Sequence, residues 1–571
     1  MTSRAAILLL WLFAACVFTA PTAWARSTFA PPAGIGPTTA TLGDVLAAAR
    51  KAYGVKRYTS RIEEGRVTAW GLKGSFRTVE SGDDYKSTAD YGVISWQEGR
   101  VAGQAWRRNP NGIVTMLHDD ALADSVQVEA LALYSRPDVQ LKLLGETSGS
   151  APAYVVEVDP KDGRPTWVFF DKKSFLATRA ELALSQARVT HTYSDFHKTG
   201  SYTDAWHEHA SDGIAQNDVD YVTTSVRYDA TITTADTAIA DPNGKLVQFP
   251  AGVNVVALPA KLVSKQGKTK FVSVENDTHD ITQPGNMSST YEVHTRADPQ
   301  VVVQLTINGR GYDFLLDSGA SGIFIDSDEI DKLGLKTFGP AQQTPYGKWV
   351  PSFALLPQLR VGEISMNNVV VNSSPGWRNN PDVGTDIVGA IGYDFLANAV
   401  VTIDYEKGAV TATSPFFFVP PADALALQAE FDEGVPYIPV QVGQTQADHF
   451  ILDTGSPNCF ISRSFAQSHA DDVKDQGTGV SMNRIWLPQY GFRGVNGVLS
   501  VRATEVKSLT ISGVAFNEWI MFMELDDRLF DPNEDGIVGY DFLKYFTVYL
   551  DYPQNQIFLL PNALARSRAG Q

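Results

Sequence analysis

The chain has 571 residues, of which 44% are hydrophobic and 11% aromatic, so it can bury several cores and form about three to four domains. Its 64 acidic and 47 basic residues give a formal net charge of −17, which opposes binding to a phosphate backbone or an anionic lipid surface. Nucleic acid is therefore not expected as a partner.

The N-terminal sequence predicts export. Arg4 precedes an apolar run that ends before the small-x-small sequence "AWA" at residues 23–25. This pattern is typical of a secretory signal peptide over residues 1–25, and the run is too short for a membrane-spanning helix. The sequence "FAAC", ending at Cys16, resembles a lipoprotein signal only loosely, so lipid anchoring is not expected. We expect a periplasmic or secreted mature chain with no transmembrane span and with Cys459 as its only cysteine.

Residues 41–229 predict a curved antiparallel β-sheet domain that carries one helix. The helix is expected in "TLGDVLAAARKAYG", and later segments such as "GVISWQEGRVAGQAW" alternate apolar and polar residues between turn signals. Aromatic residues on one face of such a sheet could line an apolar hollow, but they more often belong to the core. The residues in question are Trp70, Trp96, Trp106 and Trp167.

Residues 230–290 are richer in Thr, Ala, Asp, Asn and Pro, and they include one strand-like stretch, "LVQFPAGVNVVALPAKLV". We interpret them as a linker with a strand-bearing extension. No function is assigned to this segment.

Residues 291–562 contain an internal duplication. The segment "VVVQLTINGRGYDFLLDSGASGIFID" is repeated as "YIPVQVGQTQADHFILDTGSPNCFIS", and "DIVGAIGYDFLANAVVTIDYEKGAVTAT" is repeated as "DGIVGYDFLKYFTVYLDYPQNQIFLL". Most of each copy alternates with period two. The sequence therefore predicts two duplicated β-rich lobes, at residues 291–418 and 419–562.

Each copy places one Asp directly after an apolar strand, followed by a hydroxyl residue and a glycine: Asp317 in "DSG" and Asp453 in "DTG". Gly319 and Gly455 allow a tight turn that brings backbone N–H groups near the acid, although each Asp could also simply cap its own turn. A pseudo-two-fold axis between the lobes would bring the two carboxyl groups face to face, where they share one proton. Such a pair can activate a water for attack on an amide, which predicts peptide hydrolysis without a cofactor.

These motifs resemble those of the retropepsin and pepsin superfamily of aspartic proteases, and most closely bacterial retropepsin-like proteins with two lobes fused in one chain. The resemblance covers residues 291–561 and rests on D-[ST]-G and on an apolar-apolar-Gly element before each "YDFL". It implies that Ser318 and Thr454 brace the two turns and that Gly392 and Gly539 pack across them. It also implies a peptide or protein substrate in the cleft between the lobes.

The two copies differ in ways that bear on the site. Ser456 follows the second motif where Ala320 stands in the first, so we expect the Ser456 hydroxyl to donate to Asp453, leaving the shared proton on Asp317. Candidates for a flap are Tyr346 and Trp349 in the first copy and Trp486 and Tyr490 in the second. Simple surface loops explain these segments equally well.

Three further groups imitate functional sites. The sequence "DPNEDGIVGYDF", from Asp531, has the spacing of a calcium loop, but its twelfth place is Phe542 rather than Glu. His207 and His209 have no evident third metal ligand, and Cys459 has no neighbouring His to activate it. No metal is predicted.

The sequence as a whole predicts a mainly β, exported aspartic endopeptidase with two lobes and an N-terminal sheet domain. That N-terminal domain resembles, more loosely, bacterial lipoprotein-carrier β-folds, which curve a sheet over an apolar ligand. One alternative is therefore an envelope protein that binds a lipid or lipoprotein and uses the protease-like half as a non-catalytic scaffold. A second alternative is a protease that cleaves only its own chain.

Overall fold

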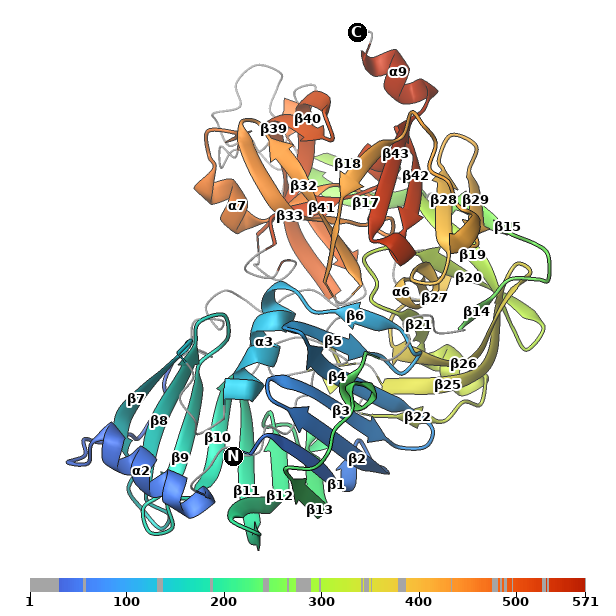
Figure 1. Cartoon of the computed structure of the whole chain (residues 1–571). Coiled ribbons are helices and arrows are strands. Elements are labelled where there is room, and N and C mark those ends of the chain that lie inside the picture. The colour runs from blue at the N-terminus through green and yellow to red at the C-terminus, as the bar shows by residue number, and fades with distance from the viewer. Residues whose placement is uncertain are drawn as a thin grey trace. The chain divides into compact units, whose positions relative to one another are not determined.

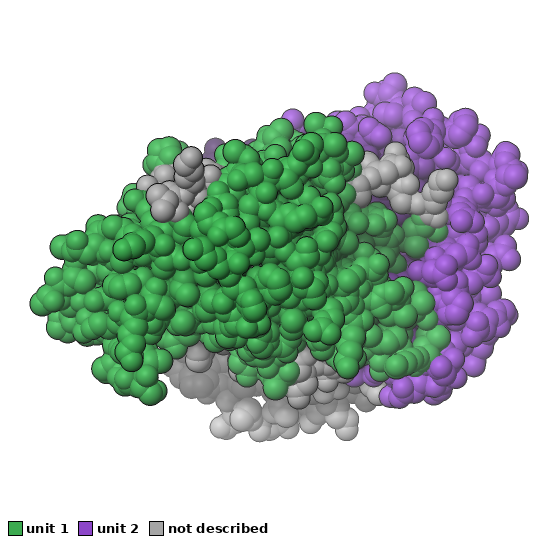
Figure 2. Space-filling view, turned by 60° about the horizontal axis from the view of Figure 1, so that its bottom comes forward, with its two compact units in different colours: residues 1–246, 335–355 green, residues 247–334, 356–571 purple. Residues whose placement is uncertain are grey.

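The structure is a computed structural model of the chain. It describes residues 30–54, 58–130, 137–184, 188–239, 246–263, 266–273, 289–296, 299–339, 342–343, 349–350, 352–377, 387–432, 434–474, 481–482, 485–486, 490–494, 497–525, 530 and 534–569. The expected signal peptide and Cys16 lie outside these residues. The chain forms two compact units (Figure 2). Unit 1 consists of Met1–Leu246 and Leu335–Leu355, and unit 2 of Val247–Gly334 and Leu356–Gln571.

Unit 1 is built on a 13-stranded sheet, and the predicted curved antiparallel sheet is confirmed (Figure 1). The strands follow the order β6-β5-β4-β3-β2-β1-β13-β12-β11-β10-β9-β8-β7. Their bounds are β1 Ser60–Ala69, β2 Leu72–Ser81, β3 Asp84–Asp90, β4 Ser95–Val101, β5 Gln104–Arg108, β6 Val114–Met116, β7 Val139–Glu146, β8 Ala153–Pro160, β9 Thr166–Asp171, β10 Ala177–Ala183, β11 Arg188–Thr199, β12 Tyr202–Ser211 and β13 Val219–Tyr228. Strands β1 to β6 pair in sequence order, and so do β7 to β13. Strand β13 pairs with β1 and joins these two halves, so β6 and β7 are the edges of the sheet.

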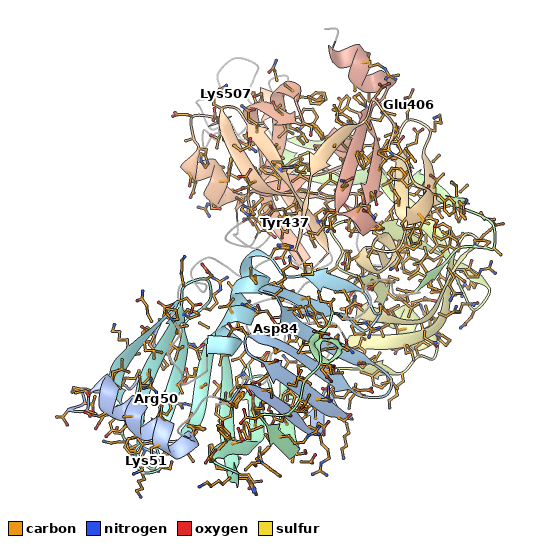
Figure 3. The ribbon with its side chains drawn as sticks, viewed as in Figure 1. Arg50, Lys51, Asp84, Glu406, Tyr437 and Lys507 are labelled. Carbon is orange, nitrogen blue, oxygen red and sulfur yellow. The ribbon has the colours of Figure 1, made fainter. Side chains whose placement is uncertain are left out.

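The expected helix is α2 (Leu42–Tyr53). The Thr41 side chain caps its first turn by accepting from the N–H of Asp44, and Arg50 and Lys51 lie in its last turn, where they offset the negative end of the helix dipole (Figure 3). The expectation of a single helix is wrong, because α3 (Asp119–Ala130) lies between β6 and β7. Its sequence, "DDALADSVQVEA", has no continuous apolar stripe that would mark a helix. A shorter helix, α4 (Thr234–Thr237), follows β13.

Three of the four tryptophans considered as a lining for an apolar hollow lie in the core of unit 1. Trp96 is 1% exposed, and Trp106 and Trp167 are 0% exposed. The indole N–H of Trp167 donates to Glu157, at 3.0 Å. These side chains therefore stabilise the sheet by burial rather than present a free apolar surface.

Unit 2 contains most of two nine-stranded sheets. The first has the order β14-β26-β21-β27-β20-β19-β25-β22, with β16 added beside β19. Its bounds are β14 Val247–Gln248, β16 Ala260–Val263, β19 Gln300–Ile307, β20 Arg310–Leu316, β21 Ile323–Asp326, β22 Thr337–Phe338, β25 Ser352–Val361, β26 Ile364–Ser374 and β27 Ile387–Ile391. Strand β22 and the first residues of β25 are counted with unit 1.

The second nine-stranded sheet has the order β31-β32-β33-β41-β34-β40-β39-β35, with β38 added beside β39. Its bounds are β31 Glu430–Asp432, β32 Val435–Val442, β33 Thr445–Leu452, β34 Phe460–Ile461, β35 Val473–Lys474, β38 Tyr490–Gly494, β39 Gly497–Ile511, β40 Val514–Glu524 and β41 Gly536–Val538. Strand β32 alternates buried and partly buried residues along its whole length, as its period-two sequence predicts.

The two sheets follow the same path. In the first, β19-β20-β27-β21-β26-β25 forms a closed ring, because β25 pairs with both β26 and β19. In the second, β32-β33-β41-β34-β40-β39 closes in the same way through β39 and β32. Sequence segments that match each other therefore occupy matching places.

A six-stranded sheet joins the two halves of unit 2, in the order β15-β29-β28-β42-β43-β30. Its bounds are β15 Val255–Leu258, β28 Val400–Asp404, β29 Ala409–Thr413, β30 Leu425–Gln428, β42 Phe546–Asp551 and β43 Gln556–Pro561. Strand β15 pairs with β29 as β30 pairs with β43. The extension before Tyr291 thus supplies β15 and β16, in the places that β30 and β31 take in the second half.

The remaining elements are short. The small hairpins pair β17 (Gln266–Ser273) with β18 (Ser289–Arg296), β23 (Gln342–Gln343) with β24 (Trp349–Val350), and β36 (Ser481–Met482) with β37 (Ile485–Trp486). The helices are α5 Ser327–Lys332, α6 Tyr393–Leu396, α7 Arg463–Ser468, α8 Tyr540–Leu543 and α9 Ala563–Ala569. Single turns of 3-10 helix in the described residues are η2 Ala215–Asn217, η3 Pro415–Phe417 and η4 Tyr552–Gln554.

Candidate active site

The two Asp residues stand at matching strand ends. Strand β20 ends one residue before Asp317, and β33 ends one residue before Asp453. The apolar residues that deliver them are fully buried, as Leu316 and Leu452 show with 0% exposure. Each strand has a parallel neighbour, β27 beside β20 and β41 beside β33. The next strands in sequence, β21 and β34, run antiparallel to these neighbours, so the chain reverses direction after each Asp.

Four hydrogen bonds cross-link the two Asp turns. The Ser318 hydroxyl donates to the carbonyl of Leu452 at 2.6 Å and accepts from the N–H of Thr454 at 2.9 Å. The Thr454 hydroxyl donates to the carbonyl of Leu316 at 2.8 Å and accepts from the N–H of Ser318 at 3.0 Å. Each hydroxyl thus satisfies one donor and one acceptor of the opposite turn, which fixes the turns relative to each other.

The two glycines allow the carboxyl groups to approach. A Cβ atom on Gly455 would lie 2.6 Å from the carboxyl carbon of Asp317, and one on Gly319 would lie 3.0 Å from the carboxyl carbon of Asp453. Any side chain at Gly455 would therefore collide with the opposite acid, since atoms of this kind do not approach within 3.0 Å. Each turn presents its backbone, and not a side chain, to the other carboxyl group.

Backbone N–H groups hold both carboxyl groups. Gly319 donates to Oδ1 of Asp317 at 2.9 Å, and Oδ1 of Asp453 accepts from Gly455 at 2.7 Å and from Ser456 at 3.1 Å. Burial, followed by the nearby charge of Asp453, raises the pKa of Asp317 well above its usual value. Burial also raises the pKa of Asp453. The two groups are hydrogen-bonded to each other, so they can hold one proton between them.

The expected role of the Ser456 hydroxyl is wrong. Its Oγ donates to the carbonyl of Asn458 at 2.8 Å, so the single hydroxyl proton is used within the loop. Ser456 does contact Asp453, but through its backbone N–H. Ala320 offers its own N–H to the Asp317 turn in the same way, so the difference in side chain does not separate the two acids.

The two apolar-apolar-Gly elements lie across the Asp turns. The N–H of Asp317 donates to Ile391 O at 3.0 Å, and the N–H of Asp453 donates to Val538 O at 3.0 Å. A Cβ atom on Gly392 would lie 2.2 Å from the carbonyl oxygen of Ala320, and one on Gly539 would lie 2.2 Å from that of Asn458. Only glycine fits against these turns.

The flap candidates stay predictions. Tyr346 lies outside the residues that the structure describes. The backbone of Trp349 belongs to β24, that of Trp486 to β37 and that of Tyr490 to β38, but the description does not extend to their side chains.

Two residues that contact the Asp turns were not predicted from the sequence. Nε2 of Gln300 donates to the carbonyl of Gly455 at 2.6 Å, and the hydroxyl of Tyr552 donates to the carbonyl of Ser318 at 3.0 Å. Tyr552 had a signal in the sequence, because "LDYPQN" repeats the place of "IDYEKG", where Tyr405 stands. Gln300 had none, since the second copy has Val435 and Pro436 at the start of β32, and neither side chain can donate a hydrogen bond.

The other candidate groups have ordinary partners. His207 and His209 both contact Asp220, at 3.1 and 3.2 Å, and the Cys459 thiol donates to Asp541 at 2.8 Å. In the part of the chain that the structure covers, no group of three or more His, Cys, Asp or Glu residues is arranged to hold a metal ion. Asp531, at the start of the calcium-like loop, lies outside that part.

Comparison with known proteins matches part of the chain to a family. Residues 303–395, which include Asp317, match the family described as aspartyl protease. No curated protein matches the chain.

Similar solved structures include a putative outer membrane lipoprotein-sorting protein domain from Vibrio parahaemolyticus, with 13% identity over 34% of this chain and 94% of that chain and a TM-score of 0.28. Conglutin gamma from lupine seeds has 10% identity over 56% and 97%, with a TM-score of 0.31. A retropepsin-like aspartic protease from Rickettsia conorii has 16% identity over 24% and 100%, with a TM-score of 0.19. All three TM-scores are below 0.5, so these similarities do not define the function of this chain.

Proposed function

We propose that the chain is an aspartic endopeptidase with two retropepsin-like lobes, in which Asp317 and Asp453 form the catalytic pair. The observation that carries the proposal is the cross-linking of the two Asp turns, which holds two carboxyl groups against each other. The match of residues 303–395 to the aspartyl protease family supports this chemistry for the first turn.

The singly protonated pair can carry out hydrolysis with one water molecule. The Asp453 carboxylate takes a proton from the water as its oxygen attacks the amide carbon, while the Asp317 carboxyl gives its proton to the carbonyl oxygen. The tetrahedral intermediate then collapses: Asp453 protonates the leaving nitrogen, Asp317 takes back a proton from the diol, and the C–N bond breaks. The pair returns to its starting state.

We also propose that the enzyme is bacterial, is exported to the periplasm or secreted, and cleaves extended peptide or protein segments. The expected signal peptide supports export. Among the helices that the structure describes, none has the length and apolarity to cross a membrane. Binding of a lipid or lipoprotein by unit 1 is the alternative, but the buried positions of Trp96, Trp106 and Trp167 do not favour a hollow lined by them.

Cleavage of a peptide library by the purified mature chain tests the proposal. Asp317→Asn and Asp453→Asn should each reduce cleavage by about 100-fold or more, because either change removes the acid or the base. Neither should lower the unfolding temperature much, since one of two repelling carboxyl groups is removed. The matched control is Asp313→Asn, on β20 and four residues before Asp317, which should cleave like the unsubstituted chain.

Full activity of Asp453→Asn would refute the proposed pair. If no peptide is cleaved between pH 3 and 8, an Asp317→Asn chain offered as substrate to the unsubstituted chain tests cleavage of its own sequence. Failure there as well would favour the binding protein.

A further inference from the structure

Two buried donors reach the Asp turns from outside the D-[ST]-G motifs. Tyr552, which is 4% exposed, donates its hydroxyl proton to the carbonyl of Ser318, and Gln300, which is 7% exposed, donates from its side-chain amide to the carbonyl of Gly455. Neither residue lies near its target in sequence, so the fold brings each of them there.

Each of these carbonyl groups belongs to a peptide unit whose N–H donates to the carboxylate of Asp317 or of Asp453, the two acids that we call the dyad. The Ser318 carbonyl is joined to the N–H of Gly319, which donates to Oδ1 of Asp317 at 2.9 Å. The Gly455 carbonyl is joined to the N–H of Ser456, which donates to Oδ1 of Asp453 at 3.1 Å. A hydrogen bond to a peptide carbonyl draws electrons from the nitrogen and makes its N–H a stronger donor.

We propose that Tyr552 and Gln300 are positioning residues, and that each strengthens the backbone hydrogen bond from one Asp turn to the carboxylate of that turn. Tyr552 acts on Asp317 through the Ser318–Gly319 peptide, and Gln300 acts on Asp453 through the Gly455–Ser456 peptide. The inference rests on the proposed aspartic protease function and adds to it two residues outside the repeated motif.

The titratable groups that face Tyr552 are the two dyad carboxyl groups and Tyr393, whose ring centroid lies 6.1 Å away. Phe431 packs against it at 4.6 Å. Burial and the two carboxyl groups raise the pKa of Tyr552 well above its usual value, so the hydroxyl remains a donor over the whole range in which the dyad titrates.

The chain contains a matched internal control. Tyr405 takes the place of Tyr552 in the first copy, is 5% exposed, and packs against Tyr540 at 5.4 Å as Tyr552 packs against Tyr393. Tyr540 and Asp453 are the titratable groups that face it. Among the described residues the Tyr405 hydroxyl has no hydrogen-bond partner. Tyr405→Phe therefore removes the same atom from a tyrosine that does not hold an Asp turn.

The pH dependence of kcat/KM separates the two residues. Oδ1 of Asp453 accepts from two backbone N–H groups, those of Gly455 and Ser456, whereas Oδ1 of Asp317 accepts from that of Gly319, so we assign the first deprotonation to Asp453. The acid limb then reports Asp453, and the basic limb reports loss of the shared proton from Asp317. Gln300→Met should raise the acid limb and Tyr552→Phe the basic limb, each by on the order of 0.3 pH unit, because one donor bond to a charged group is weakened by a fraction of its strength. Tyr405→Phe should move neither limb.

Thermal unfolding against pH gives a readout that needs no cleavage. A pKa raised in the folded state stabilises the fold below the unfolded pKa, and this stabilisation is lost as pH rises through the folded pKa. Tyr552→Phe and Gln300→Met should therefore steepen the fall of the unfolding temperature with rising pH. They should not do so in chains that also carry Asp317→Asn and Asp453→Asn.

These measurements separate failure of the inference from failure of the proposed function. If the chain cleaves no peptide and the unfolding curves still change as described, the two donors act on the dyad, but the proposed protease function is wrong. The inference is overturned if both limbs stay fixed, or if Tyr405→Phe moves them equally. Should Gln300→Met not fold, Gln300→Glu keeps the side-chain length, replaces the donor with a carboxyl group, and must raise the acid limb too.

Discussion

Two carboxyl groups that face each other cannot both be charged cheaply, and in this chain burial adds to that cost. The pKa of Asp317 and that of Asp453 are both raised by burial, and the first is also raised by the second acid. The pair should therefore keep one shared proton to a pH above the ordinary range of Asp, which is about 3.9. Backbone N–H groups, rather than charged side chains, limit the rise.

The Ser456 hydroxyl should not affect this titration. Because its proton goes to Asn458 O, Ser456→Ala should leave both limbs of the pH–rate profile in place and cost about 1 kcal/mol of stability, the worth of one hydrogen bond. The measurement is kcat/KM against pH together with urea unfolding. Thr454→Val is the contrast, since it removes two of the bonds between the Asp turns and should lower both activity and stability. A shifted acid limb in Ser456→Ala would show that the hydroxyl turns to Asp453.

Some residues of the candidate site could be predicted from the sequence, and others could not. The positions of Asp317 and Asp453 followed from two short motifs, because apolar strand, acid and glycine are local features. The contact of Gln300 with Gly455 joins residues 155 positions apart and follows only from how β19 lies beside the second turn. The bond of Ser456 was predicted wrongly because a hydroxyl can turn to either of two acceptors, and the sequence does not rank them.

At the scale of elements, β1, β2 and β12 bury a charge cluster inside unit 1. Arg61 is 0% exposed and contacts Glu63 at 2.6 Å, Glu80 at 3.1 Å and Asp204 at 3.9 Å. Glu63 also accepts from the Thr223 hydroxyl on β13. The single guanidinium therefore compensates three acids from three strands, and it fixes the register between those strands.

Arg61→Met should destabilise unit 1 by about 3–5 kcal/mol, because it keeps the bulk of the side chain but removes the positive charge that compensates three buried acids. Arg77→Met is the control, since Arg77 pairs with Glu64 and Asp236 while its side chain is 41% exposed. Urea unfolding followed by tryptophan fluorescence measures both, because Trp96 and Trp106 are buried in the same sheet. Equal midpoints for the two variants would mean that the cluster contributes no more than a surface pair.

Whole elements were predicted where their pattern is local and regular. The alternation of β32 and the capped start of α2 are visible in the sequence. Helix α3 was missed because its residues lack an apolar stripe. Strand β15 lies in the strand-like stretch that was predicted before Tyr291, but a four-residue strand carries too little periodic signal to indicate that it pairs with β29. Both depend on the partners they meet in the folded chain.

At the scale of the whole molecule, the six-stranded sheet holds the two halves of unit 2 together. Strand β28 from the first half pairs with β42 from the second, from Val401 opposite Leu550 to Asp404 opposite Thr547. Strands β15 and β30 are its two edge strands. Through β15, residues before Tyr291 thus belong to the sheet that connects the two halves, and we infer that the first copy begins near Val255 rather than at Tyr291.

Neighbouring residues of β15 test this assignment. Val256 is 4% exposed and Val255 is 55% exposed, so Val256→Asp should bury an uncompensated charge and destabilise unit 2 by about 3 kcal/mol or more, while Val255→Asp should be tolerated. Thermal unfolding of the full chain and cleavage of the peptide library measure the two effects. Because this sheet connects the two halves that bear the Asp turns, we expect Val256→Asp to lose cleavage at a temperature where Val255→Asp retains it. If both substitutions are tolerated equally, residues 255–258 are a loose linker after all, and the first copy begins at Tyr291.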